Sequence, residues 1–148
     1  MNLSSGEKVT AMIPIKEFSD DEYLVFLTKN GVIKKTEMSQ FDTSRKSGIM
    51  SISLKDDDEL ISIVKTTGDS DIIIITKNAK SITFSEKDVR PMGRTAGGVR
   101  GILLEKNDEV VGMELKNKEE ELLVVTKFGF GKRTPMKEYK VQARGGKG

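Results

Sequence analysis

The sequence of 148 residues contains no cysteine, no histidine and no tryptophan, and these absences exclude whole classes of chemistry. Without Cys or His, the chain forms no disulfide, no thiolate nucleophile, no Ser-His pair and no zinc site with Cys or His ligands. The lack of cysteine also fits a cytosolic protein. Any catalytic or metal site in this chain would therefore have to be built from other residue types, such as carboxylates.

Long apolar runs are missing as well. The longest, residues 72–75 with their neighbours, is far shorter than the ~18 residues that a membrane-spanning helix needs. Residues 1–6 lack the basic and apolar regions of a signal peptide. We expect a soluble, cytoplasmic chain. Because 36% of the residues are hydrophobic but only six are Phe and two are Tyr, the core must be mainly aliphatic.

The chain contains an internal repeat. Residues 23–36, 72–84 and 122–134 each read as strand, tight turn, strand, and their threonines Thr28, Thr76 and Thr126 lie 48 and 50 residues apart. A second landmark repeats in step with the first: Leu3, Leu54 and Leu104, each followed four residues later by an acidic residue. Two independent landmarks with a common period near 50 residues indicate three copies of one unit, roughly 1–48, 49–98 and 99–148.

Each unit is rich in β-structure signals. Apolar and β-branched runs are bounded by turn residues, and Asn30-Gly31 between two such runs is a strong hairpin signal. No stretch has the 3.6-residue apolar period of a long helix. Because a small sheet cannot bury its apolar face alone, successive units must stack on one another. The pattern therefore predicts an all-β, propeller-like fold.

Acidic clusters lie at residues 56–59 and 107–109. Such carboxylates are compatible with a metal site or with a hydrolase that uses Asp56, Asp58 and Asp108. Their recurrence at one position of the repeat instead favours turn chemistry and a solvated face. In addition, no general base pairs visibly with a nucleophile.

Charge is unevenly distributed along the chain. The formal net charge is +2, but residues 122–148 carry seven bases and one acid, whereas residues 1–121 carry 18 bases and 22 acids. A basic end on a mildly acidic body is an asymmetry typical of proteins that bind polyanions.

A loop with glycine and at least one base follows each hairpin, at residues 44–48, 93–101 and 142–148. Glycine lets backbone N–H groups approach a phosphate closely, and Arg and Lys supply the charge. One such loop per blade would place basic contacts at intervals around a rim and bend a duplex laid along it. A flexible tail is the alternative for the last loop, and a Walker-type loop is excluded because no Gly-Lys-Ser/Thr motif is present. The candidate DNA contacts are Lys34, Lys35, Arg45 and Lys46 in the first unit, Arg90, Arg94 and Arg100 in the second, and Lys132, Arg133, Arg144 and Lys147 in the third.

The motif Gln142-Ala143-Arg144-Gly145-Gly146-Lys147-Gly148 resembles the "gyrase A box", Gln-Arg-Arg-Gly-Gly-Lys/Arg-Gly. Residues 89–102 and 129–135 resemble later repeats of the same domain. The resemblance covers essentially the whole chain and implies the C-terminal DNA-wrapping domain of the bacterial DNA gyrase A protein. That domain is a β-pinwheel of four-stranded antiparallel blades, of which residues 1–148 would hold about three, open rather than closed. Ala143 replaces the first Arg, and the motif lies in the last unit rather than the first blade, so we expect a partial domain without the principal box.

The resemblance also implies a function. The domain would bind and wrap or bend DNA without sequence specificity, and so support ATP-dependent negative supercoiling by the whole type II topoisomerase. Its partners would be double-stranded DNA, the remainder of the gyrase A protein and the gyrase B protein, in the bacterial cytoplasm at the nucleoid. The resemblance implies no catalytic residue, no metal site and no cofactor in this domain, since strand cleavage, ATP and Mg belong to other parts of the enzyme. The alternatives are the equivalent domain of topoisomerase IV, or a protein-binding propeller fragment that self-associates through open blade edges.

Overall fold

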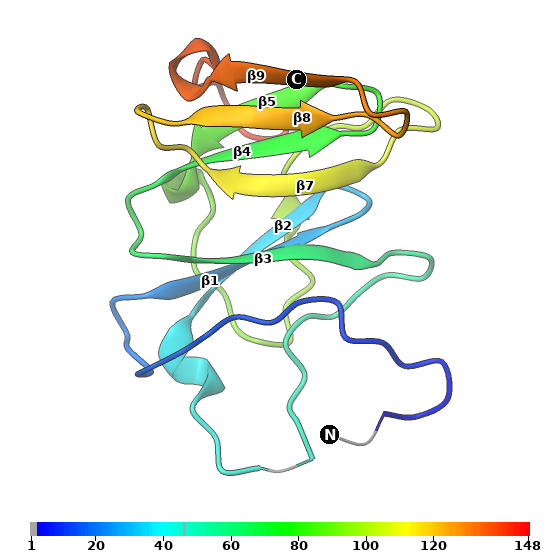
Figure 1. The fold of residues 1–148 in the computed structure, drawn as a ribbon. Helices are drawn as coiled ribbons and strands as arrows, with labels where there is room; N and C mark the ends of the chain where they lie inside the picture. The colour runs from blue at the N-terminus through cyan, green and yellow to red at the C-terminus, as the bar shows by residue number, and fades with distance from the viewer. Residues whose placement is uncertain (1–2, 46) are drawn as a thin grey trace.

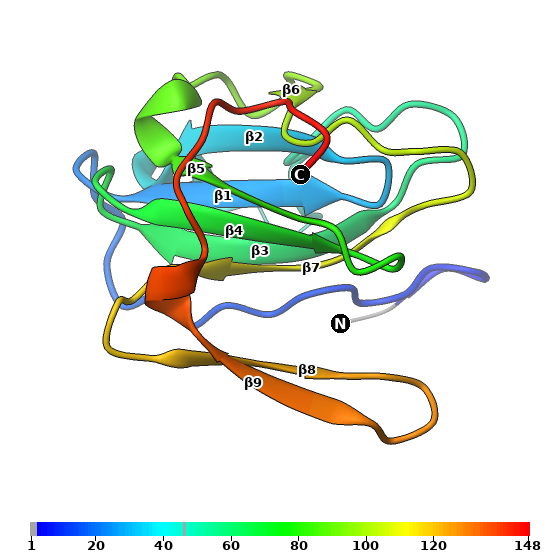
Figure 2. The same ribbon diagram turned by 90° about the horizontal axis from the view of Figure 1, so that it is seen from above.

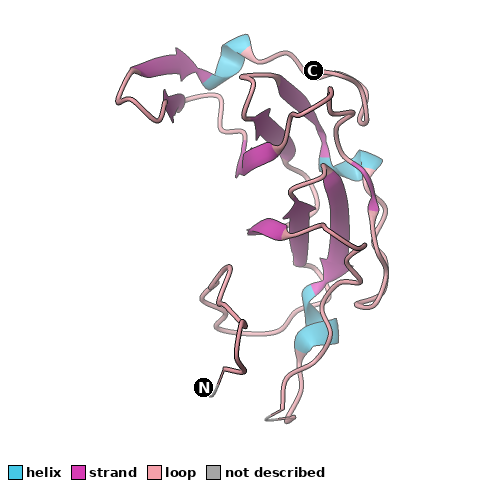
Figure 3. Cartoon of the chain, turned by 90° about the vertical axis from the view of Figure 1, so that its right-hand side faces the viewer, coloured by secondary structure: helices cyan, strands magenta, loops and turns pink. Residues whose placement is uncertain are grey.

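A computed structural model describes residues 3–45 and 47–148 (Figure 1). Within these residues the chain forms nine β-strands, three short 3-10 helices and no α-helix. None of the helices in this part of the chain has the length and apolar content needed to cross a membrane. The sheets follow one another along an arc, and the 3-10 helices lie on its outer side (Figure 3).

The strands form three separate antiparallel sheets. The first has the order β3-β1-β2-β6, from β1 (Tyr23–Thr28), β2 (Val32–Glu37), β3 (Leu60–Thr66) and β6 (Val99–Arg100). The second has the order β5-β4-β7, from β4 (Asp71–Thr76), β5 (Ser81–Ser85) and β7 (Val110–Leu115). The third is the hairpin of β8 (Glu121–Val125) and β9 (Gly131–Pro135). After each hairpin comes a 3-10 helix: η1 (Met38–Phe41), η2 (Glu86–Asp88) and η3 (Met136–Glu138). The three predicted hairpins and the open, all-β fold are therefore confirmed.

The repeated threonines have a structural role that explains their spacing. Thr28, Thr76 and Thr126 stand where the first strand of each hairpin gives way to the turn, and each hydroxyl accepts a hydrogen bond from the backbone N–H four residues later, at 3.1, 3.3 and 3.2 Å. All three turns also contain a residue with positive φ at the third position after the threonine, namely Gly31 at 79°, Ala79 at 62° and Gly129 at 82°. A threonine hydroxyl therefore closes every turn, so the three hairpins share one design.

One aliphatic core joins the first two sheets. Its members come from both sheets and from the segments between them: Val25, Leu27, Ile33, Ile72, Ile74, Ile82, Phe84, Val89, Ile102, Val110 and Met113. The buried Ile102 lies in the segment after β6, and its Cγ2 is 2.8 Å from the place that a Cβ on Gly31 would take. The loop that leaves β6 is thus packed into the joint between the two sheets.

The third sheet is covered less completely. Leu122 and Met136 are buried in a small cluster with Ile73, but Leu123 and Val125 are each 60% exposed. Viewed from above, the β8–β9 hairpin stands apart from the other strands (Figure 2). The cause is the missing neighbour on β8, because β1 pairs with β3 and β4 pairs with β7, whereas β8 pairs with β9 alone among the described residues.

The acidic clusters hold hairpin turns in place. Asp58 Oδ1 accepts hydrogen bonds from the backbone N–H of Asn30 at 3.0 Å and of Glu59 at 2.9 Å. Fifty residues later, Asp108 Oδ1 accepts the same pair of bonds from Asn78 and Glu109, and its Oδ2 accepts a 2.6 Å bond from the Thr76 hydroxyl. This arrangement agrees with the interpretation of the clusters as turn chemistry.

Replacing Asp108 should weaken the fold in a pH-dependent way. Partial burial opposes ionisation of Asp108, but its bonds from Thr76, Asn78 and Glu109 outweigh it and lower the pKa. A carboxylate with a lowered folded-state pKa stabilises the fold above its unfolded pKa of about 3.9, and this stabilisation is lost as the pH falls through the folded-state value. We expect Asp108→Ala to lower the free energy of unfolding by about 1–3 kcal/mol at pH 7. The difference in the free energy of unfolding between Asp108→Ala and the unmodified chain should become smaller toward pH 3.

Urea unfolding at pH 7 and pH 3 measures this difference. Asp56→Ala is the matched control, because Asp56 is an exposed neighbour in the other acidic cluster, and it should change stability by less than about 0.5 kcal/mol. Equal losses for the two variants, or a gap that stays constant with pH, would contradict the role assigned to Asp108.

Candidate nucleic-acid interface

Three glycine turns recur at intervals of 50 residues, and hydrogen bonds link each one to the next. They end at Gly48, Gly98 and Gly148, whose φ angles are 82°, 90° and 81°, and we call them the rim turns. A Cβ on Gly98 would lie 2.7 Å from Ile33 O, and a Cβ on Gly148 would lie 2.7 Å from Ser81 O. Glycine is therefore required at both positions, because positive φ and close backbone contact act together.

Backbone bonds tie the segments that lead into the second and third rim turns to the preceding sheet. Met92 N donates to Lys35 O at 2.9 Å, and fifty residues later Gln142 N donates to Thr83 O at 2.8 Å. Isolated parallel bridges, Lys35 with Pro91 and Thr83 with Val141, accompany these bonds. The box-like motif of residues 142–148 thus starts as a short parallel addition to β5.

Two arginines at the same repeat position link consecutive rim turns. Arg94 Nη1 donates to Met50 O at 3.4 Å, and Arg144 Nη1 donates to Arg100 O. The Nε of Arg144 also donates to Asp88 O at 3.0 Å. Both guanidinium groups belong to half-buried residues and are bound to backbone carbonyls. Each arginine therefore links one rim turn to the next, and we call this link a staple.

Most of the other candidate contacts are on the surface. The exposed ones are Arg45, Arg90, Arg100, Lys132, Arg133 and Lys147. Arg133 pairs with Glu121 at 3.3 Å, which partly neutralises it. The ion pairs formed by the described residues include none of Arg45, Arg90, Arg100 and Lys147. These four lie in or beside the rim turns. Lys46 lies outside the described residues.

The expectation that Lys34 and Lys35 contact DNA is wrong, because both side chains are buried. Lys34 Nζ donates to the carbonyls of Ser51 and Arg94. Lys35 Nζ donates to Glu86 O at 2.9 Å and lies 3.8 Å from Glu86 Oε2. Burial lowers the pKa of Lys35, and the Glu86 carboxylate opposes that shift. Lys132 occupies the repeat position of Lys34 but is exposed, since its sheet has only two described strands.

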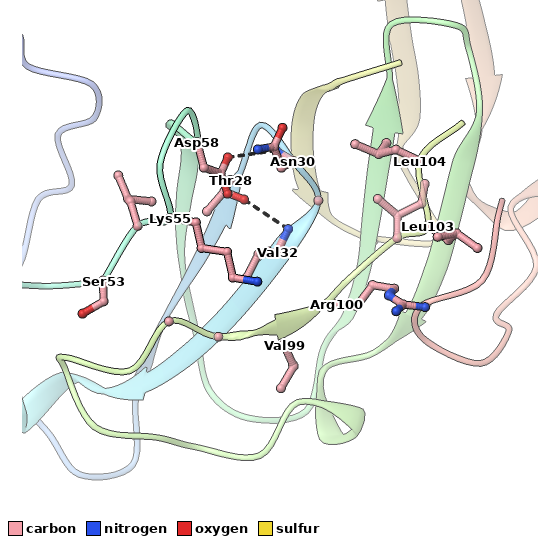
Figure 4. A pocket seen from close by; sticks show the side chains of 15 residues that line it. Thr28, Asn30, Val32, Ser53, Lys55, Asp58, Val99, Arg100, Leu103 and Leu104 are labelled. Carbon is pink, nitrogen blue, oxygen red and sulfur yellow. Dashed lines mark hydrogen bonds between the residues drawn. The ribbon is translucent and has the colours of Figure 1, made fainter. Parts of the chain in front are cut away.

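A pocket of about 530 Å³ opens between the first hairpin turn and the loop after the second rim turn. Its walls include Lys55, which extends over the pocket in Figure 4, while Arg100 is directed toward the last rim turn. The Cδ of Arg100 lies 3.7 Å from the position of a Cβ on Gly145. Lys55 is an exposed base that the repeat analysis missed, because the equivalent residue fifty positions later is Glu105.

Comparison with known sequences identifies similar proteins. A family model described as "DNA gyrase C-terminal domain, beta-propeller" matches residues 22–67, 70–115 and 120–148, and each match contains one hairpin. The DNA gyrase A protein of Staphylococcus epidermidis is 47% identical over 151 residues, and that of Staphylococcus aureus is 46% identical. Both alignments cover 100% of this chain and 17% of the relative, so the chain spans a small part of the length of these proteins.

Solved structures resemble the fold closely. The structure of a DNA gyrase A C-terminal domain matches with a TM-score of 0.89 at 30% identity, over 100% of this chain and 49% of that chain. The C-terminal domain of a DNA topoisomerase IV matches with a TM-score of 0.86 at 33% identity, over 92% of this chain and 43% of that chain. The E. coli ParC C-terminal domain, at 17% identity and a TM-score of 0.76 over 99% of this chain and 59% of that chain, shares the fold.

The staple role of Arg144 can be tested by stability alone. Arg144→Ala removes charged hydrogen bonds to two carbonyls and should lower the free energy of unfolding by about 1–2 kcal/mol. Lys147→Ala, a matched control in the same turn, should change it by less than about 0.5 kcal/mol. Denaturant unfolding of the two variants in the absence of DNA measures the difference. If Arg144→Ala leaves stability unchanged, the staple is refuted.

Proposed function

Because the chain belongs to the DNA gyrase C-terminal domain family, we propose that it binds duplex DNA along the rim turns without sequence specificity and bends it. The observation that carries the proposal is the placement of exposed bases outside the ion pairs of the described residues, Arg45, Arg90, Arg100 and Lys147, in or beside rim turns that recur every 50 residues. Cations spaced along a curved edge favour a curved path for a polyanion.

The energetics favour backbone contacts over base reading. Smoothly bending 20–30 bp costs on the order of 1–6 kcal/mol, which charge contacts to phosphates must offset. Arg and Lys beside glycine turns are suited to phosphate oxygens, which carry no sequence information. We assign the direct contacts to Arg45, Arg90, Arg100 and Lys147, with Lys55 as an added candidate, and a supporting role to Arg94 and Arg144.

We place this activity within a larger enzyme. Relatives at 46–47% identity are named as the A protein of DNA gyrase, which supports a gyrase rather than a topoisomerase IV. The chain would present bent DNA to the remainder of the gyrase A protein and to the gyrase B protein for negative supercoiling in the bacterial cytoplasm. Strand cleavage and ATP hydrolysis would belong to those other parts.

A salt titration tests DNA binding. The logarithm of the affinity should fall linearly with the logarithm of salt concentration, with a slope of about −0.9 per phosphate neutralised, and equally for duplexes of unrelated sequence. The triple variant Arg45→Ala, Arg90→Ala, Arg100→Ala should weaken binding and make the slope shallower by about 2–3.

The matched control is the triple variant Lys16→Ala, Lys118→Ala, Lys127→Ala, which makes the same change in net charge at exposed lysines outside the rim turns. It should leave the slope within about 1 of the unmodified value. Equal effects of the two triple variants on the salt slope would show that the rim turns are not the DNA-binding surface. A strict sequence preference would overturn the whole proposal.

A second candidate function is self-association through β8. Among the described residues β8 pairs with β9 alone, and its Leu123 and Val125 side chains are exposed, as at the sheet edges through which chains pair. If this surface associates, sedimentation of the chain without DNA should show a dimer that Leu123→Lys converts to a monomer. The control Met12→Lys, at a 91% exposed position outside the sheets, should leave the dimer intact. A monomer at every concentration would contradict this candidate.

A further inference from the structure

The second and third rim turns are joined by direct backbone bonds. Gly145 N donates to Gly101 O at 2.9 Å, and Leu103 N donates to Gly146 O at 2.8 Å. These two bonds, together with the Arg144 staple, hold the third turn against the segment that follows the second. The spacing at this joint is therefore set by the length of an ordinary backbone hydrogen bond.

The joint between the first and second rim turns is built differently. The bond equivalent to that of Gly145 N with Gly101 O, fifty residues earlier, would join Thr95 N to Ser51 O. Among the described residues this backbone bond does not form, and Ser51 O accepts a hydrogen bond from Lys34 Nζ instead. The same ammonium donates to Arg94 O. The remaining backbone bond, Ser53 N to Ala96 O, is long at 3.4 Å. A lysine ammonium thus stands between two consecutive turns where the next joint has a direct contact.

Burial makes this ammonium a fixed part of the joint. Lys34 has no exposed surface, its Nζ lies 5.2 Å from the centroid of the Phe26 ring, and burial, reinforced by the charge of Arg94, lowers its pKa to about 8. The equivalent residue of the second unit is Ile82, which is also fully buried. An aliphatic side chain therefore fits this position of the repeat, so packing alone does not require a lysine at position 34.

We infer that Lys34 is a positioning residue, which holds the first and second rim turns apart and so sets the path of DNA between them. Two hydrogen bonds through one nitrogen span a greater distance than one direct N–H···O bond. The bases on either side, Arg45 and Arg100, would then lie at a spacing that differs from that at the next joint. The inference rests on the proposed DNA binding, but the joint itself is observable without DNA.

The first test needs no DNA. In the full chain, Lys34→Ile gives this joint the residue found at the equivalent place in the next one. The Thr95 amide should then bond to Ser51 O, and its hydrogen exchange should slow at least tenfold, while the Thr76 amide, bonded to Lys80 O at 2.9 Å in the neighbouring hairpin, keeps its rate. Lys34→Arg, which keeps a cation, should leave Thr95 exchange unchanged. Unchanged Thr95 exchange in a folded Lys34→Ile chain overturns the inference. If Lys34→Ile does not fold, Lys34→Met provides the same comparison.

The second test reads the DNA path. Fluorescence energy transfer between the two ends of a bound 30-bp duplex should differ between Lys34→Ile and the unmodified chain, and Lys34→Arg should restore the original value. The salt slope of binding should stay the same in all three, because Lys34 touches no phosphate. A slope reduced by about 1 in Lys34→Ile, or an unchanged energy transfer, overturns the inference. A failure of the unmodified chain to bind any duplex would instead refute the proposed function. The role of Lys34 in the joint would then be tested by the Thr95 hydrogen-exchange rate alone.

Discussion

The structure depends on the burial of each sheet against its neighbour. A hairpin of this sequence has apolar residues on both faces, as Ile72–Ile74 show by being fully buried, and a single small sheet cannot remove both faces from water. The first two sheets solve this by sharing one core. The third hairpin shows the opposite case, with Leu123 and Val125 largely exposed where no neighbour among the described residues covers them. Stacking of repeats is therefore the source of stability, and the arc in Figure 3 is its outcome.

The series of rim turns follows from this stacking. The second and third turns are anchored to the sheet before them by a backbone bond and a short parallel bridge, and consecutive turns are then linked by arginines to carbonyls. Basic residues consequently have two separate roles in this fold. Some, such as Lys34, Lys35 and Arg144, bind backbone oxygens inside or between units, whereas others, such as Arg45 and Lys147, remain on the surface where a polyanion can reach them.

Much of the fold could be predicted because the signals are local. The threonines that close the hairpins recur at a fixed position, as do the acidic residues that cap the turns, so the period was visible before any contact was known. The burial of Lys34 and Lys35 was not visible, because charge favours exposure and adjacent residues of a strand face opposite sides. Their burial results from partners distant in sequence, Arg94 and Glu86. Lys55 could not be predicted as a DNA contact from the repeat, because its counterpart fifty residues later, Glu105, has the opposite charge.

We propose that the rim turns form one continuous, curved surface for DNA. Hydroxyl-radical footprinting of duplexes of unrelated sequence, bound to the full chain, is the decisive experiment. DNA bent over a rim presents one face to the protein once per helical turn, so protection should recur about every 10 bp in every duplex. Uniform cleavage along the bound DNA, or protection confined to one particular sequence, would show that the DNA does not bend over the rim turns.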